Sequence, residues 1–389
     1  MPPMRYVPLL LAACLWTLPA FGEVTRVWLT HEALGPTSLT VNWQTAEAAG
    51  SAVEYGADDR LGQVVTDATP VTLHHVRIPL DGRGGGVSYR VRSGAAATPV
   101  YRFRGYPADG LKVVVIGNAG YAKRPWGAAI AREAPHLLVG AGDYVPALHG
   151  GAEGDQVAKA DVEPFGRLID QAPEVFRTTP FLPALGNHDR EVRPRGPKPP
   201  ADGAVYDVGA AAFRAFFPLP EPGWRWRFDV PAAGVRFVAL DLSHVSDFGT
   251  TWQTCHPFAA GSEQFDWYRG VMEKGDQPFV ATVYNERNSR VRGLEKGAWG
   301  RAIAWGTLAV AGFGYFGERA QQGEEAFAWY NTSLNGTGDQ YPDPASKVVR
   351  GEDNYLLLTI VRGGRELVAE LKDLPGRTLD RRTFAPRRK

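Results

Sequence analysis

The fold of this chain is decided by the stretch Phe181-Leu182-Pro183-Ala184-Leu185-Gly186-Asn187-His188-Asp189. Five residues typical of a buried strand run directly into a glycine and three polar side chains. Glycine lets the backbone turn sharply, so the amide, imidazole and carboxylate share one tight turn. Groups of these types suit metal ligation and polarisation of a phosphate. His188 and Asp189 could equally hydrogen-bond within the loop, so both interpretations stay open.

Similar apolar strands flank this stretch on both sides, separated by amphipathic segments. We expect strands at residues 112–116, 136–139, 236–240, 279–284 and 307–311, and helices at residues 126–133, 165–171 and 262–273. Unalternated apolar strands that alternate with helices are typical of an α/β layered fold whose strands are buried on both faces. Residues 355–361 and 366–372 predict a hairpin at the end of that layer.

Most of these strands end in a turn that carries polar residues. Asn118 follows the first strand, Asp143 and Tyr144 follow the second, and Tyr315 follows the strand at 307–311. In an open α/β sheet the carboxyl ends of the strands form the crevice where ligands bind. We therefore expect these turns to converge in space.

In the first part of the chain, the apolar residues recur with a different period. Between residues 24 and 104 apolar residues alternate, as Leu39, Val41 and Trp43 do, and turn signals such as Ala49-Gly50 separate the runs. Short alternating strands without helical stretches predict an all-β sandwich of immunoglobulin or fibronectin type III kind over residues 23–106.

The N-terminal segment and the net charge indicate where the protein is located and which partners it binds. Arg5, an apolar run and small residues before Glu23 predict a cleaved signal peptide over residues 1–22, and hence a secreted or periplasmic protein. No later stretch is long and apolar enough to predict an integral membrane segment. The 43 basic residues nearly balance the 42 acidic ones, which gives no argument for a nucleic-acid partner. Oligomeric state is left open.

In this order, the Gly142-Asp143 and Gly186-Asn187-His188-Asp189 turns behind a fibronectin-like sandwich resemble the purple acid phosphatases of the calcineurin-like metallophosphoesterase superfamily. The resemblance implies that residues 107–389 form a phosphoesterase-type α/β domain. It also implies a phosphoric ester hydrolase with two metal ions bridged by an aspartate, which neutralise the phosphoryl charge and generate the attacking hydroxide.

Only part of the ligand set implied by the resemblance is present. The bridging aspartate falls on Asp143, the asparagine ligand falls on Asn187, and His188 takes the position that stabilises the leaving group. The remaining positions carry other residue types: Asn118 for an aspartate, Pro146 for a tyrosine with Tyr144 nearby, Tyr284 or Asn285 for a histidine, and Phe313 and Tyr315 for a histidine pair. Phe313 has no lone pair to donate. No histidine lies beyond position 256, so no other alignment supplies one.

Three hypotheses follow. The first is a secreted pseudo-phosphatase whose two-metal centre is lost and which binds a phosphorylated small molecule or other anionic ligand. The second is an active phosphoesterase with one weakly bound divalent or ferric ion, held by Asp143, Asn187 and a phenolate from Tyr144, Tyr284 or Tyr315. The third is a non-enzymatic extracellular module in which the sandwich alone does the binding.

Overall fold

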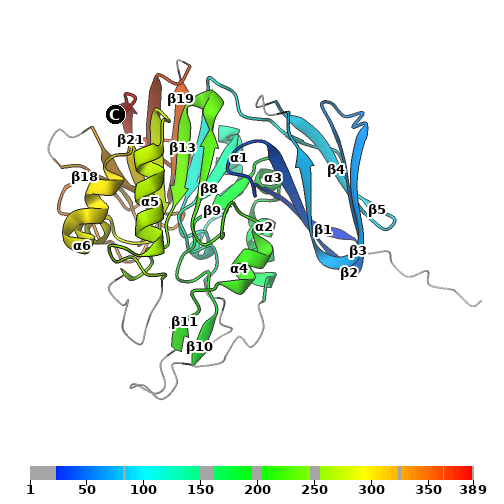
Figure 1. The fold of residues 1–389 in the computed structure, drawn as a ribbon, viewed down its shortest axis with the longest axis horizontal. Helices are drawn as coiled ribbons and strands as arrows, with labels where there is room; N and C mark the ends of the chain where they lie inside the picture. Colours follow the sequence, from blue (N-terminus) through cyan, green and yellow to red (C-terminus); the bar gives the residue numbers. More distant parts are fainter. Residues whose placement is uncertain are drawn as a thin grey trace, which may run out of the picture.

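The computed structural model describes residues 23–81, 85–146, 148, 161–194, 204–245, 255–322, 326–361 and 363–387. The expected signal peptide lies outside these residues. The described part is rich in β-strands, which form three sheets and a small ribbon of β10 (Val192–Pro194) and β11 (Ala204–Tyr206) (Figure 1). Within the described ranges, no helix has the length and apolar character that crossing a bilayer requires.

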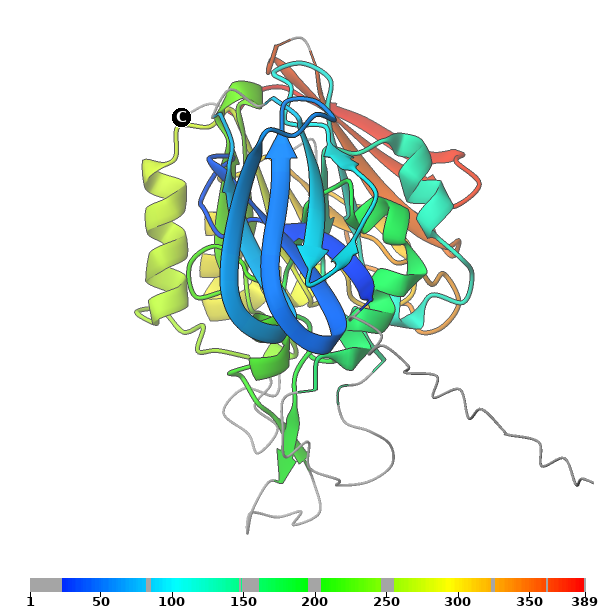
Figure 2. The same ribbon diagram turned by 90° about the vertical axis from the view of Figure 1, so that its right-hand side faces the viewer.

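The N-terminal sheet is antiparallel and has six strands. They are β1 (Val24–Thr30), β2 (Ser38–Gly56), β3 (Gln63–Pro79), β4 (Val87–Ser93), β5 (Ala96–Ala97) and β6 (Tyr101–Phe103). The predicted turn at Ala49-Gly50 is wrong, because β2 runs through it for 19 residues with only register shifts between Gln44 and Ser51. A bulge absorbs the break in alternation that the sequence suggests is a turn. The long β2 and β3 strands stand at the outer side of the molecule (Figure 2). The fibronectin type III class remains a prediction.

The rest of the chain forms two mixed sheets with helices outside them. The six-stranded sheet has the order β21 (Thr378–Phe384), β20 (Glu366–Asp373), β19 (Asn354–Val361), β7 (Leu111–Ile116), β8 (Leu137–Gly140) and β9 (Phe181–Pro183). The seven-stranded sheet has the order β12 (Trp226–Val230), β13 (Val235–Ala239), β14 (Phe279–Tyr284), β15 (Leu308–Ala311), β17 (Ala328–Asn331), β16 (Gly317–Ala320) and β18 (Ser346–Arg350). The expected strands are confirmed to within about two residues, the usual uncertainty of element boundaries.

Continuous apolar strands arise here because both strand faces are covered. In β14, Phe279, Ala281 and Val283 belong to the main hydrophobic core, while Val280 and Tyr284 belong to a second core that also contains Tyr268 and Trp299. Successive side chains point to opposite faces of a strand, so an alternating pattern is lost when both faces are buried.

Helices cover both sides of this double layer (Figure 1). α5 (Glu263–Lys274) and α6 (Asn288–Ile303) lie on one side, and α1 (Gly127–Glu133), α2 (Glu163–Gln171) and α3 (Pro173–Phe176) lie on the side of the N-terminal sheet. The described helices also include α4 (Ala211–Phe216) and the 3-10 turns η1 (Ala119–Tyr121) and η2 (Pro231–Ala233).

The N-terminal sheet and the α/β layers share one core. The ring of Trp28, which is fully buried, stacks on Phe216 of α4 at a centroid distance of 4.1 Å. The Tyr89 hydroxyl donates to the carbonyl of Arg177 at 2.7 Å. Arg26 pairs with Glu163 and Asp170 of α2 at 2.8 and 2.7 Å. The division predicted at residue 106 is therefore bridged by extensive packing.

Candidate functional site

The turns that follow β7, β8, β9, β14 and β15 meet at one edge of the two sheets. A Cβ added at Gly117 would lie 2.8 Å from the Cα of Gly312, and one added at Gly312 would lie 2.4 Å from the carbonyl oxygen of Ala141. One added at Gly186 would lie 2.4 Å from the backbone nitrogen of Asp143. The predicted convergence of the strand ends is confirmed, and glycine is required where the backbones approach this closely.

Asp189 joins the turns after β8 and β9. Its carboxylate accepts hydrogen bonds from the backbone nitrogens of Asp143, Tyr144 and Gly186 at 2.8, 2.8 and 2.9 Å. The side chain is fully buried, and burial together with the charge of Asp143 raises its pKa to about 8. Asp143 itself has a left-handed backbone with φ of 61°, an unusual conformation for a residue with a side chain. Asp189 therefore fixes the conformation that presents Asp143.

His188 is half-buried next to Asp143. Its Nδ1 lies 2.6 Å from the carbonyl oxygen of Pro146, so Nδ1 carries the proton. The Tyr121 hydroxyl donates to the same carbonyl at 2.9 Å and packs edge-on against the imidazole, with ring centroids 5.3 Å apart. The backbone nitrogen of His188 donates to Oδ1 of Asp143 at 3.3 Å. His188 and Asp143 are thus brought together.

Asn118 and Asn285 point their amide nitrogens at the backbone. Nδ2 of Asn118 lies 3.0 Å from the carbonyl oxygens of both Gly312 and Gly314, and 3.1 Å from Oγ of Ser333. Nδ2 of Asn285 lies 3.1 Å from the carbonyl oxygen of Ala141 and 3.0 Å from that of Gly312. Carbonyl oxygens only accept, so each amide must face them with its NH2 group. We call this pair of asparagines the amide clasp.

The hydroxyls of the buried tyrosines near the site form hydrogen bonds with neighbouring residues. The Tyr144 hydroxyl accepts from the nitrogen of Gly142 at 2.8 Å and donates to the carbonyl of Ala184 at 2.7 Å. The Tyr284 hydroxyl donates to Oδ1 of Asn288 at 2.8 Å. Burial raises the pKa of both phenols well above the ordinary value, which keeps them protonated.

Aromatic side chains occupy the two positions where the resemblance expects histidines. Tyr315 packs edge-on against Tyr121 at 5.5 Å, and its pKa is raised by partial burial and by Asp143. Phe313 lies 5.6 Å from Tyr341, and the Arg287 guanidinium lies over the Tyr341 ring at 3.7 Å. Sequence reasoning missed Tyr121, Arg287 and Tyr341. Tyr121 and Arg287 each lie two or three residues beyond a strand-end asparagine, a signal that could have found them.

A two-metal centre does not fit this set of side chains. Asp143 and Asn187 keep oxygen atoms, and Oδ1 of Asn187 is buried without a hydrogen-bond partner. Oδ1 of Asn285 is also buried without a hydrogen-bond partner. The Nδ2 groups of the amide clasp, however, donate to backbone carbonyls, and Phe313 has no lone pair. In the described ranges, no three His, Cys, Asp or Glu side chains are grouped so that they could hold an ion.

A second polar cluster lies directly behind the Gly-Asn-His-Asp turn. Arg190 and Asp241 form an ion pair with both side chains fully buried, and Nε of Arg190 donates to the carbonyl of Gly186 at 3.1 Å. Asp241 also accepts from Nδ1 of His256 at 2.6 Å. Burial opposes ionisation of Asp241, but Arg190 and His256 outweigh it and lower its pKa. Through the hydrogen bond from Arg190 to Gly186, this cluster holds the Gly-Asn-His-Asp turn in place.

The fold is similar to that of a known protein. The solved structure titled "Structure of PhoD" superimposes with a TM-score of 0.66 at 12% sequence identity, over 94% of each chain. A glycosyl hydrolase family 2 member from Bacteroides cellulosilyticus gives a TM-score of only 0.24 at 9% identity, over 76% of this chain and 38% of that one, which carries no argument. No family profile and no curated protein sequence matches the chain. The likeness to PhoD shows that the two chains share a fold.

Proposed function

We propose that this protein is a secreted pseudo-phosphatase related to the purple acid phosphatases, in which hydrogen bonds have replaced the two-metal centre. One observation carries the proposal. The amide clasp places two NH2 groups on the carbonyl oxygen of Gly312, where the resemblance expects metal ligands. Ligands to a cation must direct lone pairs at it, whereas these groups direct protons at the backbone.

The physical role of the clasp follows from its contacts. The strand ends after β7, β8, β14 and β15 bring backbone carbonyl oxygens close together, and buried acceptors need donors. Asn118 and Asn285 supply donors from two different strand ends to three carbonyls, those of Gly312, Gly314 and Ala141. The site is thereby held together without a cation.

Partly exposed side chains beside the amide clasp are a candidate surface for ligand binding. His188, Tyr121 and Tyr315 form one group of ring contacts, and Phe313 and Tyr341 form another with Arg287. Rings and a guanidinium suit a ligand with a flat or anionic part, such as a phosphorylated small molecule.

A second candidate function is phosphoester hydrolysis with one ion. The buried Oδ1 atoms of Asn187 and Asn285 favour it, because neither has a hydrogen-bond partner and a ligand would satisfy both. Asp143 and Tyr315 would supply the other oxygen ligands. Tyr144 and Tyr284 are less suitable, because their hydroxyls already donate hydrogen bonds to Ala184 and Asn288.

Hydrolysis assays distinguish the pseudo-phosphatase from the one-ion phosphoesterase. The purified protein is tested on p-nitrophenyl phosphate and bis-p-nitrophenyl phosphate, with and without added Mn²⁺, Zn²⁺ or Fe³⁺, beside Asp143→Ala prepared in the same way. The pseudo-phosphatase predicts equal background rates for both proteins under every condition. A metal-dependent rate that Asp143→Ala abolishes would establish the second function instead.

A further inference from the structure

Arg287 lies beside the candidate site, in the short turn between β14 and α6, and its side chain is partly exposed. Among the residues that the structure describes, no group accepts a hydrogen bond from its guanidinium or forms an ion pair with it. The neighbouring carboxyl group of Glu286 accepts instead from the backbone nitrogens of Arg287 and Val245, at 2.7 and 3.0 Å. The N–H groups of the guanidinium therefore remain available to another acceptor.

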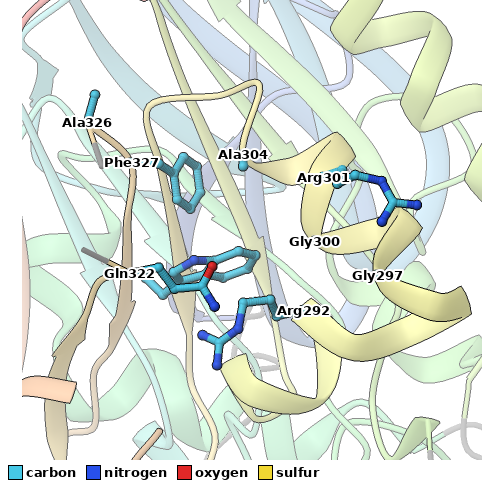
Figure 3. Close-up of a pocket in the computed structure, with 9 residues that line it drawn as sticks. Arg292, Gly297, Gly300, Arg301, Ala304, Gln322, Ala326 and Phe327 are labelled. Carbon is cyan, nitrogen blue, oxygen red and sulfur yellow. The ribbon is translucent and has the colours of Figure 1, made fainter. Parts of the chain in front are cut away.

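Arginines of adjacent segments are paired with buried carboxylates. Arg190, directly after the Gly-Asn-His-Asp turn, forms its ion pair with Asp241. Arg292 lines a separate hollow beside α6 (Figure 3) and donates to both oxygens of Asp343, at 2.7 and 2.8 Å. These pairs hold the framework of the fold together. Arg287 differs from them, because its charge faces rings and solvent.

Two aromatic rings hold the guanidinium of Arg287 in place. Its central carbon lies 3.7 Å from the centroid of the Tyr341 ring and 5.3 Å from that of the Phe313 ring. Both rings are partly exposed, and their centroids are 5.6 Å apart. A cation is attracted to the face of an aromatic ring. A side chain held in this way loses less conformational freedom when it binds a ligand, so Arg287 is preorganised for binding.

Gly314 and Tyr315 connect this group of side chains to the amide clasp. A Cβ added at Gly314 would lie 3.0 Å from Cδ2 of Tyr341, and the carbonyl oxygen of Gly314 accepts from Nδ2 of Asn118 at 3.0 Å. Partial burial and the charge of Asp143 raise the pKa of Tyr315, which keeps its hydroxyl protonated. In the described part of the chain this hydroxyl has no hydrogen-bond partner, so it is a second available donor.

A bound phosphoryl group needs positive charge and hydrogen-bond donors, and the resemblance assigns the positive charge to two metal ions. A guanidinium meets both needs, because its planar fork matches two phosphate oxygens with two parallel hydrogen bonds. We propose that Arg287, in place of the metal ions, neutralises the phosphoryl group of the ligand, with the Tyr315 hydroxyl as a further donor. This inference rests on the proposed function, the metal-free binding of a phosphorylated small molecule.

Isothermal titration calorimetry with phenyl phosphate tests the proposal on the purified protein, in EDTA to remove metal ions. The wild type should bind phenyl phosphate saturably. Arg287→Gln should weaken binding about tenfold or more, because hydrogen bonds from a charged donor are lost. Arg287→Lys keeps the charge but not the fork, and Tyr315→Phe removes one neutral donor, so each should weaken binding about threefold.

Two control variants separate this role from a general effect of charge. Arg290→Gln removes the same charge from an exposed residue of α6 and should bind phenyl phosphate as the wild type does. Asp143→Asn should bind it at least as tightly as the wild type, because a repelling carboxylate is removed. A metal centre bridged by Asp143 predicts the reverse for that variant.

The possible outcomes distinguish this proposal from the proposed function. Absence of saturable binding by the wild type, equal affinities of Arg287→Gln and wild type, or an equal loss in Arg290→Gln would overturn the role of Arg287 and leave the amide clasp standing. Binding that appears only when Mn²⁺ or Zn²⁺ replaces EDTA, and that Asp143→Asn abolishes, would overturn the proposed function and this proposal with it.

Discussion

Replacing Asn118 by aspartate tests the amide clasp most sharply, because it restores the residue that the resemblance expects there. The asparagine is only 2% exposed and faces the carbonyl oxygens of Gly312 and Gly314. A carboxylate would turn an oxygen towards both. Gly312 keeps a donor from Asn285, but Gly314 loses its side-chain donor.

The size of the effect follows from these contacts. A buried acceptor without a donor costs about 1–3 kcal/mol, and an unpaired buried carboxylate adds to that or stays protonated. We expect Asn118→Asp to lower the free energy of unfolding by about 3 kcal/mol at pH 7.5. The deficit relative to wild type should be smaller at pH 5, because a protonated carboxyl group can donate one hydrogen bond.

Urea unfolding followed by circular dichroism measures the difference. Asn335→Asp is a matched control, because Oδ1 of Asn335 already accepts from the nitrogen and the hydroxyl of Thr337 at 3.0 and 2.9 Å. That control should cost less than about 1 kcal/mol. An Asn118→Asp protein as stable as the wild type, which also binds a divalent ion stoichiometrically, would refute the reasoning.

Three other predictions concern the framework of the site. Tyr144→Phe should cost about 2 kcal/mol in urea unfolding, since it removes buried hydrogen bonds to Ala184 and from Gly142, and a neutral result would show that the hydroxyl does not hold the turn. Burial lowers the pKa of His31 to about 4 from an ordinary value near 6.5, so below pH 6.5 the unfolded state binds a proton that the folded state excludes. The contribution of His31 should therefore be full above pH 6.5 and fall by about 3 kcal/mol as pH drops to 4. Because burial also lowers the pKa of His74 and of His75 to about 4, His31→Gln should make the fall in stability smaller without abolishing it. The isolated fragment 23–106 should show no cooperative unfolding, because Trp28 loses its contact with Phe216; a folded fragment that binds the ligand would support the third hypothesis.

Much of the α/β layer could be predicted from the sequence because its strands are buried on both faces. Residues 279–284 read as an unbroken apolar run, and β14 occupies those positions with its two faces in two cores. α6 was not predicted, because its sequence combines polar residues with a break at Glu295–Gly297 that interrupts the helical period. The turn expected at Ala49-Gly50 failed because a bulge and a turn share the same residue types.

At the candidate site, the sequence predicts which residues come together but not which way their side chains point. Motif position alone placed Asp143, Asn187 and His188 at neighbouring strand ends, and contacts in the structure join these turns. It could not tell that Asn118 and Asn285 present NH2 groups, because that depends on carbonyl oxygens about 27 to 196 residues away in the chain. The shared core of the N-terminal sheet was hidden for the same reason, since Trp28 and Phe216 are distant in sequence.

The most direct test of the central claim is the metal content of the wild-type protein. The purified chain is incubated with Fe³⁺, Zn²⁺ or Mn²⁺ in excess, freed of unbound metal by gel filtration and analysed by inductively coupled plasma mass spectrometry beside Asp143→Ala. A site held by the amide clasp predicts far less than one ion per chain, with no difference between the two proteins. One or two ions per wild-type chain that are missing from Asp143→Ala would contradict the account.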